Sequence, residues 1–269
     1  MASQSVNNTK TRPSRPNLIS IQRKPIFKEV KHPLSFCLVN IRSIRNKIAD
    51  FTDYVCNNKF DFIAVTETWL KSIDDSLRAQ LCLPGYKFYD RPREGKGGGG
   101  TALLHRDSLN ITKSNCGQTE SFEFSEWIIK STGSCNIRLI ILYKPPYLDD
   151  HRVPVSAFLK FFCYMESIVL SKEHLLNAGD FNLHVDMASD IDARKFLDLI
   201  NSLGLQQHVD KPTHIHLHTL DLIITRKTST IIQSVPRVHR HFSDHACVIG
   251  HLRIDKPSVK IRLGYIQEV

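Results

Sequence analysis

Two short polar runs stand next to apolar segments, and their side chains are of the types that act on phosphate esters. Gly-Asp-Phe-Asn at 179–182 follows the apolar run 174–178, and Ser-Asp-His at 243–245 precedes the apolar run 246–249. Apolar runs bounded by turn residues indicate buried strands. Asp, Asn and His side chains at strand ends can converge on one metal ion and one phosphate. The two runs therefore predict a phosphoesterase site.

Oxygen-bearing side chains at other strand ends could complete a metal site. Mg²⁺ binds oxygen ligands, generally one or two carboxylates, and keeps several of its waters. Glu67 follows the apolar run 62–66, and Asn40 and Asp244 stand at the ends of two other apolar runs. We expect these three residues to supply the metal site.

The remaining polar residues suit acid–base and electrostatic roles. Asp180 is a candidate general base for water, and Asn182 is a candidate hydrogen-bond donor to the oxyanion. His245 needs a carboxylate to orient it if it is to act as a charged phosphate ligand. Asp221, which precedes the apolar run 222–224, is the candidate for that carboxylate.

The order of these motifs resembles the endonuclease/exonuclease/phosphatase superfamily, which has the DNase I-like fold. The resemblance covers roughly residues 34–254. It rests on six segments: Leu38-Val39-Asn40, Thr66-Glu67-Thr68-Trp69, Tyr143, Gly179-Asp180-Phe181-Asn182, Leu220-Asp221-Leu222 and Ser243-Asp244-His245.

Four strings are similar, more specifically, to the endonuclease of non-LTR (LINE-type) retrotransposons. They span residues 40–47, 66–70, 97–100 and 143–146. In that family the domain nicks chromosomal DNA, and the freed 3′-hydroxyl primes reverse transcription. The family's Arg-x-Gly-Arg pattern before the glycines is replaced here by residues 91–96, where Glu94 adds a negative charge. The parent element is expected to encode a reverse transcriptase, but the sequence contains no polymerase motif.

The resemblance implies a role for each site residue. Mg²⁺, or Mn²⁺ in its place, would be held or positioned by Asn40, Glu67 and Asp244. Tyr143 would contact the scissile phosphate, and Asp180 would activate the attacking water. Asn182 would orient the phosphate, and the His245–Asp221 pair would stabilise the phosphorane. The products would be a 3′-hydroxyl and a 5′-phosphate.

The pattern of apolar residues predicts an α/β fold of four layers, with two mainly antiparallel sheets packed face to face and helices outside them. Strands are expected at 36–39, 60–66, 86–90, 100–105, 123–130, 137–143, 174–178, 220–225 and 246–252. Helical spacing of apolar residues occurs from Ile44 to Val55, from Phe158 to Ile168 and from Phe196 to Leu203. The predicted domain spans 34–254, between a basic segment at 1–33 and a C-terminal tail at 255–269.

The net charge of +9 is concentrated at the start of the chain. Residues 1–31 hold seven Lys or Arg and one acidic residue, Glu29. A basic Ser/Asn/Pro-rich segment without hydrophobic periodicity is predicted to be disordered. It would serve as a nucleic-acid contact or nuclear import signal, or be only a solvated tail. We expect a nuclear, monomeric protein that binds DNA and no membrane, with its seven cysteines reduced in the core.

Two further functions fit the same residues. One keeps the fold and changes the substrate, giving an abasic-site repair nuclease or a phosphatase of small phosphoesters. The other is a catalytically dead domain that only binds DNA or protein. His214, His216 and His218 alternate, but no cysteine or spaced carboxylate accompanies them to complete a zinc site, so we interpret them as a polar loop.

Overall fold

The computed structural model describes residues 25–29, 33–131, 135–146, 155–255 and 260–265. The chain divides into two compact units. The larger is Lys31–Pro257, and the smaller combines Met1–Val30 with Ser258–Val269. None of the described helices has the length and apolar character needed to cross a lipid bilayer.

Within the smaller unit, β1 (Pro25–Glu29) pairs antiparallel with β14 (Lys260–Tyr265). The sequence predicted no regular structure before residue 33, so β1 departs from that expectation. The partner strand lies at the other end of the chain, and such a pairing cannot be read from local pattern. The rest of the basic segment, at 1–24 and 30–32, lies outside the described residues.

The larger unit contains two sheets of six strands. The first sheet runs in the order β12 (Arg237–His241), β13 (Ala246–Asp255), β2 (Pro33–Asn40), β3 (Phe62–Thr66), β5 (Thr101–Arg106) and β4 (Tyr86–Arg91). The second runs β10 (Leu205–Gln207), β11 (Asp221–Arg226), β9 (His174–Asp180), β8 (Ile137–Tyr143), β7 (Glu123–Ile129) and β6 (Ile111–Gln118). Within these sheets, β2 pairs parallel with β3 and β8 with β9, and the other neighbours are antiparallel.

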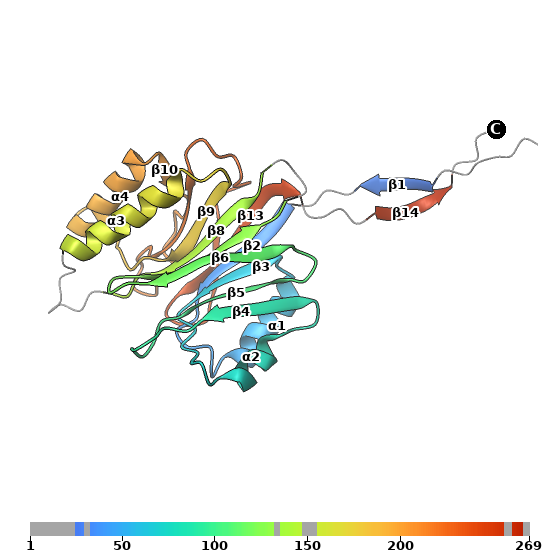
Figure 1. Ribbon diagram of the computed structural model, residues 1–269, viewed down its shortest axis with the longest axis horizontal. Helices are drawn as coiled ribbons and strands as arrows, with labels where there is room; N and C mark the ends of the chain where they lie inside the picture. The colour runs from blue at the N-terminus through green and yellow to red at the C-terminus, as the bar shows by residue number, and fades with distance from the viewer. Residues whose placement is uncertain (1–24, 30–32, 132–134, 147–154, 256–259, 266–269) are drawn as a thin grey trace, which may run out of the picture. The chain divides into compact units, whose positions relative to one another are not determined.

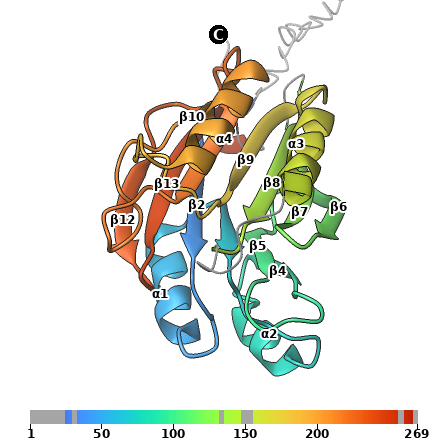
Figure 2. The ribbon, with the colours of Figure 1, turned by 90° about the vertical axis from the view of Figure 1, so that its left-hand side faces the viewer.

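Helices cover the outer faces of both sheets (Figures 1 and 2). The first sheet packs against α1 (Ile48–Asn58) and α2 (Asp75–Leu81) through one apolar cluster. The second packs against α3 (Val155–Val169) and α4 (Ile191–Ser202) through another. The predicted four-layered sandwich is thereby confirmed.

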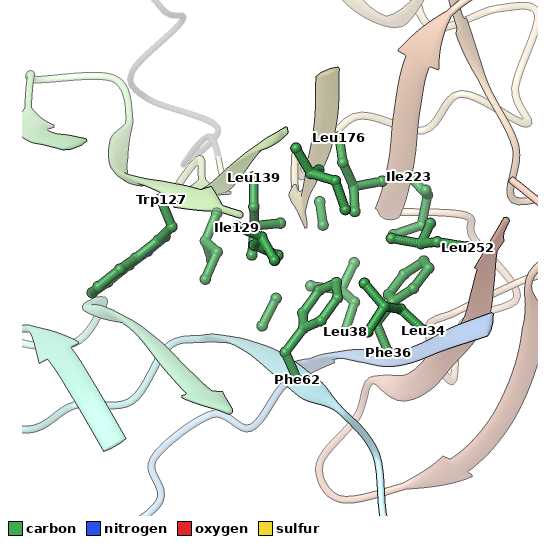
Figure 3. Packing of buried hydrophobic residues seen from close by; sticks show 14 of the residues in the cluster. Leu34, Phe36, Leu38, Phe62, Trp127, Ile129, Leu139, Leu176, Ile223 and Leu252 are labelled. Carbon is green, nitrogen blue, oxygen red and sulfur yellow. The ribbon is translucent and has the colours of Figure 1, made fainter. Parts of the chain in front are cut away.

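The main core lies between the sheets (Figure 3). Alternate residues of β2 and β3 face it, and the rings of Phe36 and Phe62 stack there at 5.5 Å. The intervening residues, such as Cys37 and Val39, face α1 instead. Because both faces of β2 are buried, its sequence is a continuous apolar run rather than an alternation. Burying one side chain such as Phe36 stabilises the fold by about 1.5–3 kcal/mol.

Several local expectations differ from the structure. The helix expected from Ile44 begins at Ile48, and Ile44 lies in the preceding loop, where its backbone N–H donates to the Thr68 carbonyl oxygen. The sequence did not predict α2, β6, β10 or β12, because they are short or largely exposed and lack apolar periodicity. Cys37 and Cys247 are buried, whereas the other five cysteines are exposed or half-buried rather than in the core.

Candidate active site

The two parallel strand pairs bring the predicted residues to one end of the sandwich. Asn40 ends β2, and Glu67 follows β3, its parallel neighbour. Tyr143 ends β8 and is paired with Asp180 at the end of β9. Parallel strands end on the same edge of a sheet, so these four residues share one region. β11 runs antiparallel to β9, so its first residue, Asp221, lies opposite Asp180 at the end of β9. β13 runs antiparallel to β2, so Asp244 and His245, just before β13, lie near the end of β2.

Asp180 is fully buried, and two amides hold its carboxylate. Its Oδ2 accepts hydrogen bonds from Nδ2 of Asn40 at 2.7 Å and from Nδ2 of Asn182 at 2.9 Å. Its Oδ1 accepts from the backbone N–H of Asn182 at 3.0 Å. Asn182 has a φ of 45°, a left-handed conformation that Asn tolerates better than most residues. The turn after β9 thus folds back onto the carboxylate at the end of that strand.

Gly179 allows the close approach of the strands that carry this carboxylate. It pairs with Leu142 across β8 and β9. A Cβ atom at Gly179 would lie 1.9 Å from the Leu142 carbonyl oxygen, well inside van der Waals contact. The glycine before Asp180 is therefore a packing requirement.

Glu67 is held in place by two side-chain hydrogen bonds. Its Oε1 accepts from Nδ2 of Asn40 at 2.9 Å, and its Oε2 accepts from Nε1 of Trp69 at 2.9 Å. Asn40 therefore bridges Glu67 and Asp180, while its own Oδ1 accepts the backbone N–H of Arg42. In this arrangement Asn40 positions Glu67.

The glycine run supports the loop that carries Glu67. Backbone carbonyls of Gly99 and Gly100 accept hydrogen bonds from the N–H groups of Trp69 and Thr68. Gly99 has a φ of +67°, a left-handed conformation that favours glycine, and a Cβ atom there would lie 2.4 Å from Oε1 of Glu123. The glycine run therefore packs directly against the backbone of the loop that carries Glu67.

His245 and Asp221 form a buried pair, with Nδ1 and Oδ2 2.7 Å apart. Burial alone would lower the pKa of His245, but the negative charge of Asp221 and its hydrogen bond outweigh burial and raise the pKa to about 10. The imidazole is therefore cationic at neutral pH. Burial, together with the charge of Asp221, raises the pKa of Asp180 to about 8.

Asp244 lies at the mouth of the site between two basic side chains. Its Oδ2 pairs with Arg42 and lies 3.4 Å from Nε2 of His214. Burial opposes ionisation, but the positive charges of His245 and Arg42 hold the pKa of Asp244 below its usual range. Its Oδ1 is buried and has no hydrogen-bond partner among the described residues.

Tyr143 also lines the site, and its pKa is raised by burial and by the charges of Glu67 and Asp180. The guanidinium of Arg93 lies 5.2 Å from the centre of the Tyr143 ring. Arg93 in turn pairs with the buried carboxylate of Glu123 at 3.2 Å. Glu123 is the register partner of Tyr143 on β7.

These residues surround a cleft of about 370 Å³. Five predicted residues line it: Glu67, Tyr143, Asn182, Asp244 and His245. Asn40, Asp180 and Asp221 are buried and contact that lining through the hydrogen bonds described above. All eight predicted residues are thus assembled around one cleft.

The donor set suits a divalent cation with oxygen ligands. Glu67 and Asp244 present carboxylates to the cleft, and the unpartnered Oδ1 of Asp244 offers a free ligand atom. Two carboxylates with open space for water match the preference of Mg²⁺. In the part of the chain described, the tight groups of acidic and His ligand atoms are Asp180, Asp221 and His245, and His214, Asp244 and His245. Glu67 belongs to neither group.

Sequence reasoning missed Arg42, Arg93, Glu123 and His214. Their contacts join segments far apart in the chain, as in the pairs Arg42–Asp244 and Arg93–Glu123. Only the three-dimensional fold reveals such pairs. Arg93 stood in a segment noted for its departure from the retrotransposon pattern, but its stacking on Tyr143 left no local signal.

The two six-stranded sheets and the polar cleft at their end agree with the fold and site expected from the motifs. Residues 37–245 match the model of the Endonuclease/Exonuclease/phosphatase family, and the chain belongs to that family. The superfamily predicted from the motifs is confirmed. Members of this group are nucleases and phosphatases with the DNase I-like fold.

Solved structures with this fold include a retrotransposon domain. The endonuclease domain of TRAS1, a telomere-specific non-LTR retrotransposon, has a TM-score of 0.63 and 16% identity, over 83% of this chain and 99% of that one. An AP endonuclease from Archaeoglobus fulgidus has a TM-score of 0.65 and 17% identity, over 82% and 99%. The 3′ phosphatase NExo from Neisseria, bound to a product DNA hairpin, has a TM-score of 0.63 and 16% identity, over 81% and 99%. No curated protein matches the sequence.

Proposed function

We propose that this protein is a metal-dependent DNA endonuclease of the retrotransposon type. The observation that carries the proposal is the buried Asp180 carboxylate, held by two amides beside the cationic His245–Asp221 pair. A base and a cation at one cleft are the two elements that in-line hydrolysis of a phosphodiester needs. The intact set argues against a domain that only binds.

Glu67 and Asp244 would hold Mg²⁺, with Mn²⁺ as an alternative, and the ion would neutralise charge on the phosphate oxygens. Ionised Asp180 accepts the proton of the attacking water, and its raised pKa makes this carboxylate a stronger base than an ordinary Asp. The N–H of the His245 imidazole that does not face Asp221 donates to a nonbridging oxygen and stabilises the phosphorane.

Asn182 and Tyr143 complete the phosphate contacts. Nδ2 of Asn182 donates both to Asp180 and to the Lys144 carbonyl oxygen. A contact from this amide to phosphate would replace one of those bonds. The hydroxyl of Tyr143 stays protonated because the pKa of Tyr143 is raised, so it can donate to the scissile phosphate.

The preference for DNA rests on the strings around the site. Trp69, in the retrotransposon-like run 66–70, donates to Glu67, and Lys144, in the run 143–146, accepts from Asn182. The strings that resemble the retrotransposon group therefore contact the proposed catalytic residues themselves. We extend the proposal to a nuclear location, where chromosomal DNA is the substrate.

Nicking of supercoiled plasmid tests this function. Wild type should nick with Mg²⁺ and not with EDTA, and primer extension should succeed from the new end because it is a 3′-hydroxyl. His245→Gln should lose the activity, whereas His251→Gln, on the same strand β13 and outside the cleft, should retain it.

Oligonucleotide substrates separate the alternatives. Cleavage confined to abasic-site duplex would favour a repair nuclease, and release of phosphate from a 3′-phosphorylated end would favour a phosphatase. DNA binding without hydrolysis of any substrate would favour the binding-only domain and contradict the proposal.

A further inference from the structure

A second group of histidines lines the same cleft and has no part in the proposed reaction. His184 lies in the turn after β9, and His218 lies in the loop before β11. Their ring centres are 4.3 Å apart. In the sequence, His218 belongs to an alternating run of histidines without carboxylates, and no local pattern links it to His184.

Each of these two imidazoles is oriented by its own carboxylate. Nδ1 of His184 lies 3.1 Å from Oδ2 of Asp190, and Nδ1 of His218 lies 3.0 Å from Oδ2 of Asp186. The carboxylates are anchored in turn. Asp190 caps α4 by accepting the N–H of Ala193, and Asp186 accepts the N–H of Thr219.

This arrangement fixes the tautomer of both rings. A carboxylate facing Nδ1 keeps the proton on Nδ1, which leaves the lone pair on Nε2. Across the described residues, no hydrogen bond involves the Nε2 atom of His184 or His218. Both side chains are partly exposed, so an ion can reach them from solvent.

The neighbouring histidines are engaged differently. Nε2 of His214 faces Asp244, and Nδ1 of His214 accepts the backbone N–H of His216. His216 contacts the His214 ring, and no carboxylate orients it in the described residues. The carboxylate–imidazole pattern that accompanies metal-bound histidine therefore occurs at His184 and His218.

We propose that His184 and His218 form a second metal site, for a late first-row divalent ion such as Zn²⁺. Imidazole nitrogens favour zinc, nickel and copper over magnesium, which prefers oxygen. Two nitrogen ligands leave the remaining positions to water or to an oxygen of the substrate. The site is distinct in chemistry from the carboxylate pair Glu67 and Asp244, which we propose as the ligands of Mg²⁺.

Calorimetric titration of Zn²⁺ into the protein, in millimolar Mg²⁺ at neutral pH, tests the proposal. One equivalent should bind to wild type, and both His184→Gln and His218→Gln should weaken binding by at least about tenfold. His216→Gln, from the same loop and cleft, is the matched control and should bind as wild type does. Glu67→Gln should also bind one equivalent of Zn²⁺, because this substitution alters only the carboxylate site.

An NMR measurement on the wild type avoids dependence on variants. Zn²⁺ should shift the Nε2 resonances of His184 and His218 and leave that of His216 in place. The proposal is overturned if His184→Gln and His218→Gln both bind Zn²⁺ with wild-type affinity. It is also overturned if Glu67→Gln no longer binds one equivalent of Zn²⁺, or if Zn²⁺ does not shift the Nε2 resonances of His184 and His218.

Discussion

Nδ1 of His245 lies 2.7 Å from the carboxylate of Asp221, and both side chains are buried. The pair is assembled from the loop before β13 and the first residue of β11. The negative charge of Asp221 keeps His245 protonated in a place where burial alone would deprotonate it. The cation of the site therefore depends on a second residue.

Replacing Asp221 by Asn should lower the pKa of His245 from about 10 in the metal-free protein, because the largest of the charges that raise it is removed. In wild type the pKa of His245 is higher in the folded state than in the unfolded chain. The contribution of the His245–Asp221 pair to stability is therefore complete below about pH 6.5 and is lost as the pH rises through about 10. NMR titration of the imidazole checks the shift. An unchanged pKa in Asp221→Asn would show that another group maintains the charge.

Asp180→Asn should reduce nicking by at least about 10²–10³-fold while the fold is retained. The raised pKa of Asp180 means that the folded protein holds this proton more tightly than the unfolded chain. The ionisation of Asp180 therefore lowers the free energy of unfolding of wild type as the pH rises from about 4 toward 8. Asn cannot ionise, so the variant should lack this part of the dependence. Urea unfolding across that pH range, without metal, provides the measurement, and identical profiles would contradict the assignment.

Trp69→Phe should raise the Mg²⁺ concentration needed for half-maximal nicking by about 10–100-fold. The variant keeps an aromatic ring but removes the Nε1 hydrogen bond that orients Glu67. Trp127→Phe removes an indole hydrogen bond to Ser125, away from the cleft, and should leave the Mg²⁺ requirement unchanged. Equal Mg²⁺ requirements in Trp69→Phe and wild type would show that Glu67 does not need this support.

Gly179→Ala should destabilise the protein by at least about 1–3 kcal/mol, because the added methyl group meets the backbone of β8. Gly97→Ala is the matched control, since no atom lies within 4 Å of its added Cβ. Denaturant unfolding of both variants gives the comparison. Similar stabilities for the two would mean that β8 and β9 separate at little cost.

The sequence predicted the fold, and it singled out eight residues that the structure assembles around one cleft, because apolar runs and the polar residues beside them are local patterns. Buried strands appear as apolar runs, and Asp180 or His245 directly adjoins such a run. The sequence did not reveal contacts between segments far apart in the chain, such as Arg93 with Glu123 or His184 with His218. It also missed edge elements such as β6, whose residues are mostly exposed and carry no periodic apolar signal. Local pattern encodes which strands exist, whereas their mutual alignment decides which side chains meet.

The eight predicted site residues lie on or next to strands inside the sheets, and the edge strands β4, β6, β10 and β12 carry none of them. An edge strand can lengthen, shorten or exchange its side chains without moving the interior strands that hold the reacting groups. The sandwich thereby separates the part of the molecule that holds the candidate site from the part that can adapt to a new surface. A lineage of such proteins can change what it cuts by altering its margins and keep its chemistry intact.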